Sequence, residues 1–417
     1  MSDVFCSDPS QAAAGRMKIE WARSHMPVCG ALSQRFLRDR PLAGLRVALS
    51  IHLEAKTARL AELLRDAGAE MAVTGSNPLS TQDDVACALA AGGMEVFARY
   101  NADEGRYRRH LLQVLEPGPH LVIDDGGDLV HLLHTERADL AAGVLGGAEE
   151  TTTGVLRLRL LAREGKLSFP MLAVNDARCK FLFDNRYGTG ESVWAAVMRT
   201  TNLLVAGKTV VVMGYGWCGK GVALRARGLG AHVVVTEVDP VRAIEAHMDG
   251  YRVLPSEEAA AVGDVFITVS GCQDLLTRRH FEVMKDGALL ANAGHFDVEI
   301  NLPDLAAIAQ ERQTVRPNIE RFTLAGGRRL YLLAGGRLVN LAAGDGHPVE
   351  IMDLSFALQA LSAVYLAQRG RELEKKVYPV PAGLDLEVAE LKLASLGVRI
   401  DRLTGEQGRY LGLEEEP

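Results

Sequence analysis

Polar side chains follow several apolar runs in the first part of the chain, at the points where strands are expected to end. They are His52 after RVALSI, Ser76 and Asn77 after AVTG, Asp124 and Asp125 after LVI, and Asn175 and Asp176 after MLAV. The carboxyl ends of parallel strands meet at one edge of a sheet, where open α/β sheets bind their ligands. Any one of these residues could simply cap the following helix. Four such strand ends together favour a crevice that holds a polar small molecule and transfers protons.

A second chemical signal is a glycine-rich turn within KTVVVMGYGWCGKGVALRARGLGAHVVVTEVDP. Gly214, Gly216 and Gly219 form GxGxxG directly after a predicted strand, which lets the backbone approach a pyrophosphate at the start of the next helix. Glu237 follows the next strand, where its carboxylate can accept both ribose hydroxyls and would repel a 2′-phosphate. The turn therefore predicts NAD and not NADP. Gly221 replaces the hydroxyl residue of a triphosphate-binding loop, so triphosphate hydrolysis is not predicted.

Two runs of alternating strands and helices must position these residues. One run covers about 44–128 and the other begins near Lys208 and reaches about Asn340. This order predicts an α/β protein with two doubly wound parallel-sheet domains and a C-terminal helical tail. We expect a substrate domain at 1–183 and 348–380, a Rossmann NAD domain at 184–347, and an oligomerisation tail at 381–417. The apolar segment from Glu350 is expected to be a helix packed on the first domain or on another subunit.

Composition excludes several partners. The net charge of −7 leaves no basic stripe for nucleic acid. The sequence contains no uninterrupted run of about 18 apolar residues, so it predicts no membrane span. The six cysteines are scattered without zinc-ligand spacing, so the sequence predicts no metal site and a reducing cytoplasm.

With these residues in view, the sequence resembles the S-adenosylhomocysteine hydrolase family along nearly its whole length. The matching strings, in family order, are NPLSTQDD, DDGGDL, EETTTGV, FDNRYG, GYGWCGKG, TEVDP, GHFDVEI, GRLVNL and GHP. The resemblance implies reversible hydrolysis of S-adenosyl-L-homocysteine to adenosine and L-homocysteine, a reaction of the S-adenosylmethionine cycle in one-carbon metabolism. It also implies that NAD oxidises the ribose 3′-hydroxyl, which acidifies C4′, so that homocysteine leaves C5′, water adds and the hydride returns.

The matched motifs imply a catalytic group. Its members are His52, Asp125, Glu150, Lys180, Asp184 and Asn185. Lys180 and Asp184 would handle the 3′-hydroxyl proton, and we expect a cationic nicotinamide to lower the pKa of Lys180. Glu150 would hold the ribose hydroxyls, and His52 and Asp125 would act around C4′ and C5′.

The resemblance also implies the residues that bind substrate and cofactor. The substrate residues are Glu54, Lys56, Thr57, Ser76, Asn77, His295 and His347. The NAD residues are Thr151, Thr152, Thr153, Asn185, Gly214, Gly216, Trp217, Cys218, Gly219, Glu237 and Asn340. The expected partners are a small nucleoside–homocysteine substrate and further copies of the chain in a homotetramer or dimer.

One departure from the family concerns the nucleobase. The frequent string HMT(V/I)(E/Q)T is here HLEAKT, so Glu54 replaces a threonine and Lys56 replaces a Glu or Gln at the purine edge. An ammonium can only donate hydrogen bonds and suits a 6-oxo group better than the amino group of adenine. S-inosyl-L-homocysteine is therefore an alternative substrate. Lys56 could instead turn away to pair with Glu54 or Asp84, which would leave adenine acceptable.

A second departure is the end of the chain, YLGLEEEP, where many relatives have a Lys- and Tyr-containing tail. The segment SLGVRIDRLTGEQGRYLG resembles the family's exchanged segment, so we expect an oligomer but faster NAD release. Two other functions share the architecture. An ordinary NAD-dependent dehydrogenase would accumulate NADH, and a catalytically silent NAD-binding regulatory homologue would have lost the catalytic residues, which are present here.

Overall fold

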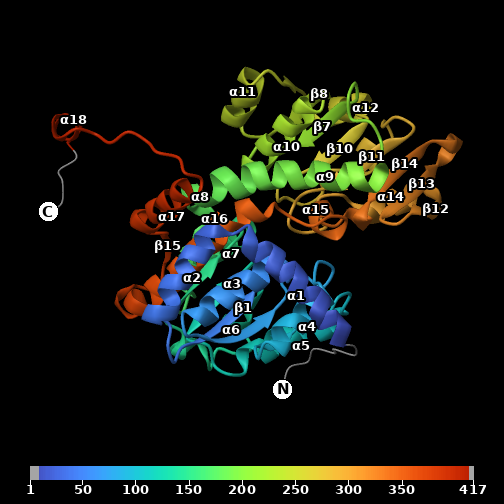
Figure 1. Ribbon diagram of the computed structural model, residues 1–417. Coiled ribbons are helices and arrows are strands. Elements are labelled where there is room, and N and C mark those ends of the chain that lie inside the picture. The colour runs from blue at the N-terminus through green and yellow to red at the C-terminus, as the bar shows by residue number, and fades with distance from the viewer. Residues whose placement is uncertain (1–8, 413–417) are drawn as a thin grey trace.

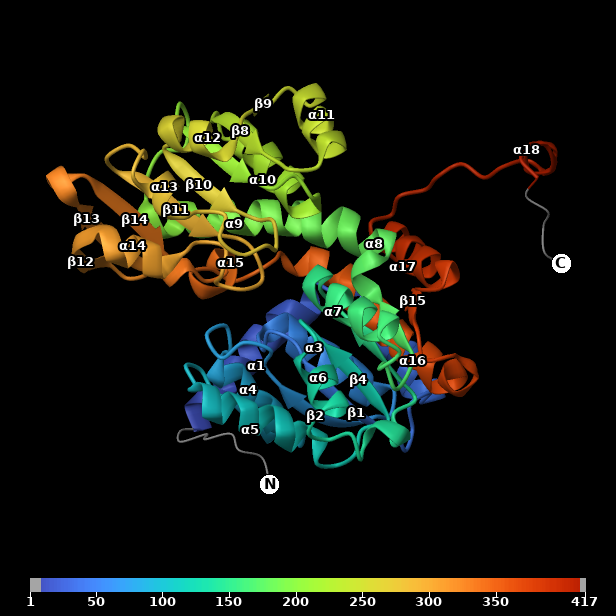
Figure 2. The same cartoon turned by 180° about the vertical axis from the view of Figure 1, so that it is seen from behind.

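Residues 9–412 are described by a computed structural model, in which the chain forms two α/β lobes (Figure 1). The N-terminal part of the chain builds one lobe and the middle part builds the other. The chain then returns to the first lobe, as the view from behind also shows (Figure 2). The predicted class, α/β with two doubly wound domains, is confirmed.

The first lobe is built on a seven-stranded sheet in which every strand pair is parallel, in the order β15-β6-β5-β4-β1-β2-β3. Its strands are β1 (Arg46–Ser50), β2 (Glu70–Thr74), β3 (Glu95–Phe97), β4 (Leu121–Asp124), β5 (Gly146–Glu149), β6 (Met171–Ala173) and β15 (Val377–Pro379). Ser50 lies beside Thr74 on one side and Asp124 on the other, so the carboxyl ends of these strands are level. The loops that follow them therefore meet at one edge.

Helices cover both faces of this sheet. They are α1 (Pro9–Ser24), α2 (Pro27–Asp39), α3 (Ala55–Asp66), α4 (Asp83–Ala91), α5 (Glu104–Leu115), α6 (Asp128–His134), η1 (Ala141–Gly143), α7 (Thr152–Arg163) and η2 (Val174–Asp176). Side-chain caps set several helix starts. Glu54 accepts two N–H groups in the first turn of α3, Asp103 accepts one in the first turn of α5, and Thr151 accepts one in the first turn of α7. The cap residues Glu54 and Thr151 end the short loops that follow β1 and β5, so helix initiation also fixes these site loops.

The second lobe contains an eight-stranded sheet in the order β12-β13-β14-β11-β10-β7-β8-β9. Its strands are β7 (Thr209–Met213), β8 (His232–Thr236), β9 (Arg252–Val253), β10 (Val265–Thr268), β11 (Ala288–Asn292), β12 (Ala309–Arg316), β13 (Ile319–Leu324) and β14 (Arg329–Leu333). Its helices are α10 (Trp217–Gly228), α11 (Pro240–Met248), α12 (Ser256–Val262), α13 (Arg278–Phe281) and α14 (Leu302–Ile308), with η4 (Ala325–Gly327) and η5 (Ala334–Gly336). Five pairings are parallel, whereas β13 runs antiparallel to β12 and β14. The antiparallel β12 was not predicted, because nearly all of its side chains are exposed.

The crossing between the lobes is helical but not uniformly α-helical. It starts with the short α8 (Arg178–Lys180), continues as the π-helical segment η3 (Phe181–Gly188) and ends in α9 (Thr189–Thr201). π-Helical turns are rare and occur often at functional sites. The return crossing runs through α15 (Val339–Ala342) into α16 (Val349–Arg369) and η6 (Gly370–Glu372).

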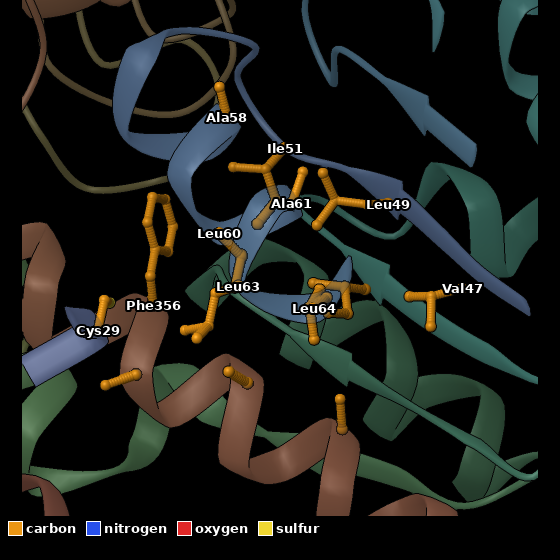
Figure 3. Close-up of a cluster of buried hydrophobic side chains, with 14 of the residues drawn as sticks. Cys29, Val47, Leu49, Ile51, Ala58, Leu60, Ala61, Leu63, Leu64 and Phe356 are labelled. Atoms are coloured by element: carbon orange, nitrogen blue, oxygen red, sulfur yellow. The ribbon is translucent and has the colours of Figure 1, made fainter. Parts of the chain in front are cut away.

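Helix α16 is a core helix of the first lobe. It packs on α2, α3, β4 and β5, as one of the two expected arrangements predicted. Figure 3 shows Phe356 of α16 beside Cys29 and the apolar side chains of α3 and β1. The segment Val349–Glu372 is long and apolar enough to cross a membrane, but 72% of its qualifying window is buried inside the protein. Its apolar composition is accounted for by this packing.

The last described helices are α17 (Ala382–Ser395) and α18 (Gly405–Tyr410). Helix α17 packs against α2, α8 and α16. Beyond it the chain leads away from both lobes (Figures 1 and 2). Val398, Ile400 and Leu403 are exposed on this segment.

Candidate active site

A cavity of about 500 Å³ opens between the two lobes. One wall consists of residues that follow strands of the first sheet, together with α8 and η3. The other wall consists of residues that follow β7, β10 and β11 of the second sheet. The predicted substrate crevice and the predicted dinucleotide turn therefore border the same space.

Lys180 lies at the centre of a buried network on the cavity wall. Its Nζ is 3.0 Å from Asp184 Oδ2 and 3.3 Å from Glu150 Oε1, and it donates a hydrogen bond of 2.9 Å to Asn185 Oδ1. The π-helical turn that follows α8 presents Asp184 and Asn185 to the same lysine. Three acceptors thus surround an ammonium group that has three N–H donors.

The pKa of Lys180 is set by two opposing effects. Burial lowers it, but the charges of Asp184 and Glu150 outweigh burial and raise the pKa above its ordinary value. The sequence led us to expect a lowered pKa, because we assumed a cationic ring beside the lysine. In the protein's own field the pKa is raised instead, since the two carboxylates dominate, and the lowered pKa beside oxidised NAD stays a prediction. Lys180 is therefore a cation in the protein alone.

Asp184 is held by three partners. Besides Lys180, His347 Nδ1 lies 2.5 Å from its Oδ1, and Ser355 Oγ donates a hydrogen bond of 2.7 Å to its Oδ2. Burial raises the pKa of Asp184, but Lys180 and His347 overcome this and bring the pKa below its usual range. The carboxylate is therefore ionised and fixed in direction.

Glu150 follows β5 and is as deeply buried as Lys180. Its Oε2 accepts a hydrogen bond of 2.5 Å from Gln359 Nε2. Burial is the main cause that raises the pKa of Glu150 to about 7, with Lys180 opposing and Asp184 adding to the rise. This carboxyl group therefore changes charge close to neutral pH.

His52 forms a second polar group with residues from neighbouring strand ends. Its Nδ1 lies 2.5 Å from Ser80 Oγ, its Nε2 lies 3.6 Å from Asp125 Oδ2, and Ser76 Oγ donates to the same Oδ2 at 3.0 Å. Burial lowers the pKa of His52 to about 4, although Asp125 opposes this. Ligand-type atoms of His52, Asp125 and His295 all lie within 4.8 Å of one another. A neutral imidazole at this position can accept or relay a proton.

The HLEAKT residues lie at another part of the cavity wall. Lys56 Nζ is 2.8 Å from Glu54 Oε2 and donates a hydrogen bond of 2.8 Å to the backbone oxygen of Asp345. Asp84, the other partner considered from the sequence, pairs with Lys18. Lys56 therefore pairs with Glu54, yet both side chains still line the cavity.

The glycine turn after β7 provides a dinucleotide cradle. Gly214 has a φ of +116°, which favours glycine, and a Cβ on Gly219 would lie 2.0 Å from Gly214 O. Around Gly216 the nearest atom to an added Cβ is 3.8 Å away, in Arg242. The turn thus leaves space before the N-terminus of α10, where N–H groups can receive a pyrophosphate. Glu237 accepts Tyr215 N at 2.7 Å and so lies beside this turn.

A Gly219→Ala substitution should weaken NAD binding by at least about tenfold. The added Cβ cannot remain 2.0 Å from Gly214 O, so the turn must move away from its present path. Titration of NAD-free protein with NAD in a calorimeter measures the change. Gly228→Ala is the matched control, because Gly228 is the last residue of the same helix, α10, and a Cβ added there meets nothing within 4 Å. Equal affinity in the Gly219 variant and the wild type would contradict the prediction.

Residues near the expected nicotinamide end also suit the cofactor. Asn340 Nδ2 donates to Ser192 Oγ at 2.9 Å, whereas its Oδ1 is buried without a partner among residues 9–412. An unsatisfied buried carbonyl on a cavity wall can accept a hydrogen bond from a carboxamide such as that of nicotinamide. Thr151, Thr152 and Thr153 line the same cavity. The residues present therefore fit NAD.

Five predicted site residues do not line the cavity: Ser76, Asn77, Gly214, Gly219 and Glu237. All five contact or belong to the turns that border the cavity. Asn77, for example, accepts Ser80 Oγ through its backbone oxygen at 3.0 Å. The other predicted site residues all line the cavity, including Thr57, whose Oγ1 donates to His52 O at 2.7 Å.

Sequence reasoning missed four residues that hold the site together: Ser80, Glu299, Ser355 and Gln359. Glu299 accepts the backbone N–H groups of Ser270 and Gly271 at 3.1 and 2.8 Å, and burial raises its pKa to about 7. Ser80 and Glu299 lie inside strings that match the family, which was an available signal. Ser355 and Gln359 lie in an apolar helix and gave none.

The chain is similar to known proteins along nearly its whole length. The family model described as S-adenosyl-L-homocysteine hydrolase matches residues 3–142, and the model of its NAD-binding domain matches residues 185–346. An adenosylhomocysteinase of Thermotoga maritima is 56% identical over 397 residues, which cover 95% of this chain and 98% of that protein. An S-inosyl-L-homocysteine hydrolase of Methanopyrus kandleri is 55% identical over 410 residues, which cover 98% of this chain and 97% of that protein. A second protein of that name, from Methanococcus maripaludis, is 54% identical over 411 residues, covering 99% of this chain and 98% of that protein.

Proposed function

The chain belongs to the S-adenosyl-L-homocysteine hydrolase family, and we propose that it reversibly hydrolyses S-adenosyl-L-homocysteine to adenosine and L-homocysteine with NAD as its cofactor. The observation that carries the proposal is the position of Lys180. Its ammonium lies between Asp184 and Glu150 on the wall of a cavity whose other wall is the dinucleotide turn.

The proposed roles follow from the contacts of each side chain. Bound NAD would accept the hydride from C3′ as the 3′-hydroxyl is oxidised to a ketone, and the ketone would make the neighbouring C4′ hydrogen acidic. Lys180, oriented by Asp184, takes the 3′-hydroxyl proton. Because Lys180 is protonated in the protein's own field, it can do so only after the positive charge of oxidised NAD has lowered its pKa. Glu150, when ionised, accepts hydrogen bonds from the ribose hydroxyls.

His52 and Asp125 are assigned to the proton transfers at C4′ and C5′. The assignment is supported by the neutral state of His52 and by the hydrogen bonds that fix Asp125 and the imidazole. Asn185 links Lys180 to Asn175 and keeps the lysine in place. His347 and His295 are assigned to the sugar and amino-acid parts of the substrate.

The activity test is homocysteine release from S-adenosyl-L-homocysteine by NAD-loaded protein, followed with a thiol reagent while absorbance at 340 nm is recorded. The proposal predicts steady thiol release with no accumulation of NADH. A stoichiometric rise of NADH would identify an ordinary dehydrogenase, and NAD binding without thiol release would identify a silent homologue.

The second candidate substrate is S-inosyl-L-homocysteine. Lys56 favours it, because this side chain can only donate hydrogen bonds and lines the cavity. Glu54 offers little free acceptor capacity to adenine, since it already receives Lys56 Nζ and two backbone N–H groups at the start of α3. The ratio of kcat/KM for the two nucleoside conjugates separates the candidates.

We also propose the domain division 1–183 with 348–380, 184–347, and 381–417 as the oligomerisation segment of a homotetramer or dimer. The exposed Val398, Ile400 and Leu403 support this, because an extended apolar segment gains stability by packing on another copy. A cytoplasmic location is proposed from the scattered cysteines.

A further inference from the structure

Two polar residues on the apolar helix α16 face the site from behind. Ser355 and Gln359 are separated by one helical turn and are both fully buried. Neither lines the cavity. Polar side chains in such a position lose their hydration, so they persist only where hydrogen bonds compensate for the loss.

Their hydrogen bonds go to the two carboxylates that flank Lys180. Ser355 Oγ donates to Asp184 Oδ2 at 2.7 Å, and Gln359 Nε2 donates to Glu150 Oε2 at 2.5 Å. Lys180 Nζ lies 3.0 Å from the same Oδ2 of Asp184, and 3.3 Å from the other oxygen of Glu150, Oε1. One helix, α16, therefore donates a hydrogen bond to each of the two carboxylates beside the lysine.

We propose that Ser355 and Gln359 are paired positioning residues, which hold Asp184 and Glu150 in the orientation that Lys180 needs for proton transfer at the 3′-hydroxyl. This rests on the proposed function and extends it to a helix from the far end of the chain. Sequence separations of 171 and 209 residues show that the chain must return to the first lobe before its site is complete.

Gln359 has a second effect, on the charge of Glu150. Lys180 of α8, Asp184 of η3, Asp125 of the loop after β4 and Gln359 of α16 all act on this carboxyl group. Burial raises its pKa to about 7, and the Gln359 donor lowers it. Removing the Gln359 donor destabilises the ionised carboxylate relative to the protonated form. The pKa of Glu150 therefore rises, and a smaller fraction of Glu150 is ionised at neutral pH.

The test measures kcat and the pH profile of kcat/KM for three variants of the NAD-loaded protein. Gln359→Met should lower kcat at pH 7 about tenfold and move the acid limb up by about one pH unit. Ser355→Ala should lower kcat by a similar factor and leave the limb in place, since Lys180 and His347 still keep Asp184 ionised. Ser362→Ala is the control, because this buried serine on the same helix has no partner for its Oγ among the described residues.

Thermal unfolding and NAD content show whether each variant is folded. Should Gln359→Met fail to fold, Gln359→Glu replaces it, since a second carboxyl group beside Glu150 must move the limb upward even further. An unmoved limb together with wild-type kcat in both variants overturns the proposal. Loss of activity only in proportion to lost folded protein also overturns it. If the wild type itself released no homocysteine, the proposed function would fail instead.

Discussion

The Lys180→Arg variant is expected to fold and to bind NAD, while its kcat falls by about 10³-fold. Arginine keeps a positive charge between Asp184 and Glu150, so the buried carboxylates retain their counter-ion. A guanidinium does not release its proton in proteins, whereas the proposed step requires a neutral amine at this position. The measurement is homocysteine release under saturating substrate, with reduction of bound NAD followed at 340 nm in a single turnover.

Two further variants separate chemistry from folding. Lys180→Met leaves two buried carboxylates without their cation and should reduce the free energy of unfolding by about 3–5 kcal/mol, so its loss of activity is less informative. Lys166→Arg is a matched control, because this lysine is exposed and pairs only with exposed Glu164 in the described structure. A Lys180→Arg enzyme with nearly wild-type kcat would exclude Lys180 as the proton acceptor.

Much of the fold was readable because its signals are local. The apolar run Val210–Met213 of β7 is continuous and is followed at once by Gly214. The spacing of Gly214 and Gly219 is recognisable because the turn packs closely on the helix that follows it. Strand β5 was harder to predict, since Gly146 and Gly147 carry no strand pattern. Strand β12 showed no alternation of apolar and polar residues either, because nearly all of its side chains are exposed.

The site itself was predictable in its membership and less so in its electrostatics. Lys180 and Asp184 were identified, yet the π-helical turn that brings Asn185 to the same lysine has no sequence pattern of its own. The charge state of Lys180 depends on Glu150, which lies thirty positions earlier in the chain. The two residues meet only because the first sheet places the end of β5 beside α8. Likewise, the donors on α16 are recognisable only from their contacts, because serine and glutamine within an apolar helix have many possible roles.

The nucleobase prediction can be tested at Lys56. The second candidate substrate predicts that the wild type prefers S-inosyl-L-homocysteine, and that Lys56→Gln moves the ratio of kcat/KM toward S-adenosyl-L-homocysteine by about 10²-fold or more. Lys56 Nζ already donates to Glu54 and to Asp345 O, both at 2.8 Å, which leaves one N–H for a base. A 6-oxo group accepts that hydrogen bond, whereas the 6-amino group of adenine presents another donor to it. Glutamine carries an amide oxygen and can accept from adenine.

Lys56→Met provides the control for this experiment. It removes the donor without adding an acceptor, so kcat/KM for the inosyl substrate should fall while the adenosyl value stays near that of the wild type. The ratio should then lie between those of the wild type and Lys56→Gln. The ammonium and the base edge must be in contact for this order to hold. If the three proteins gave the same ratio, Lys56 would serve only to hold Glu54 and the Asp345 loop, and the base would be selected elsewhere in the cavity.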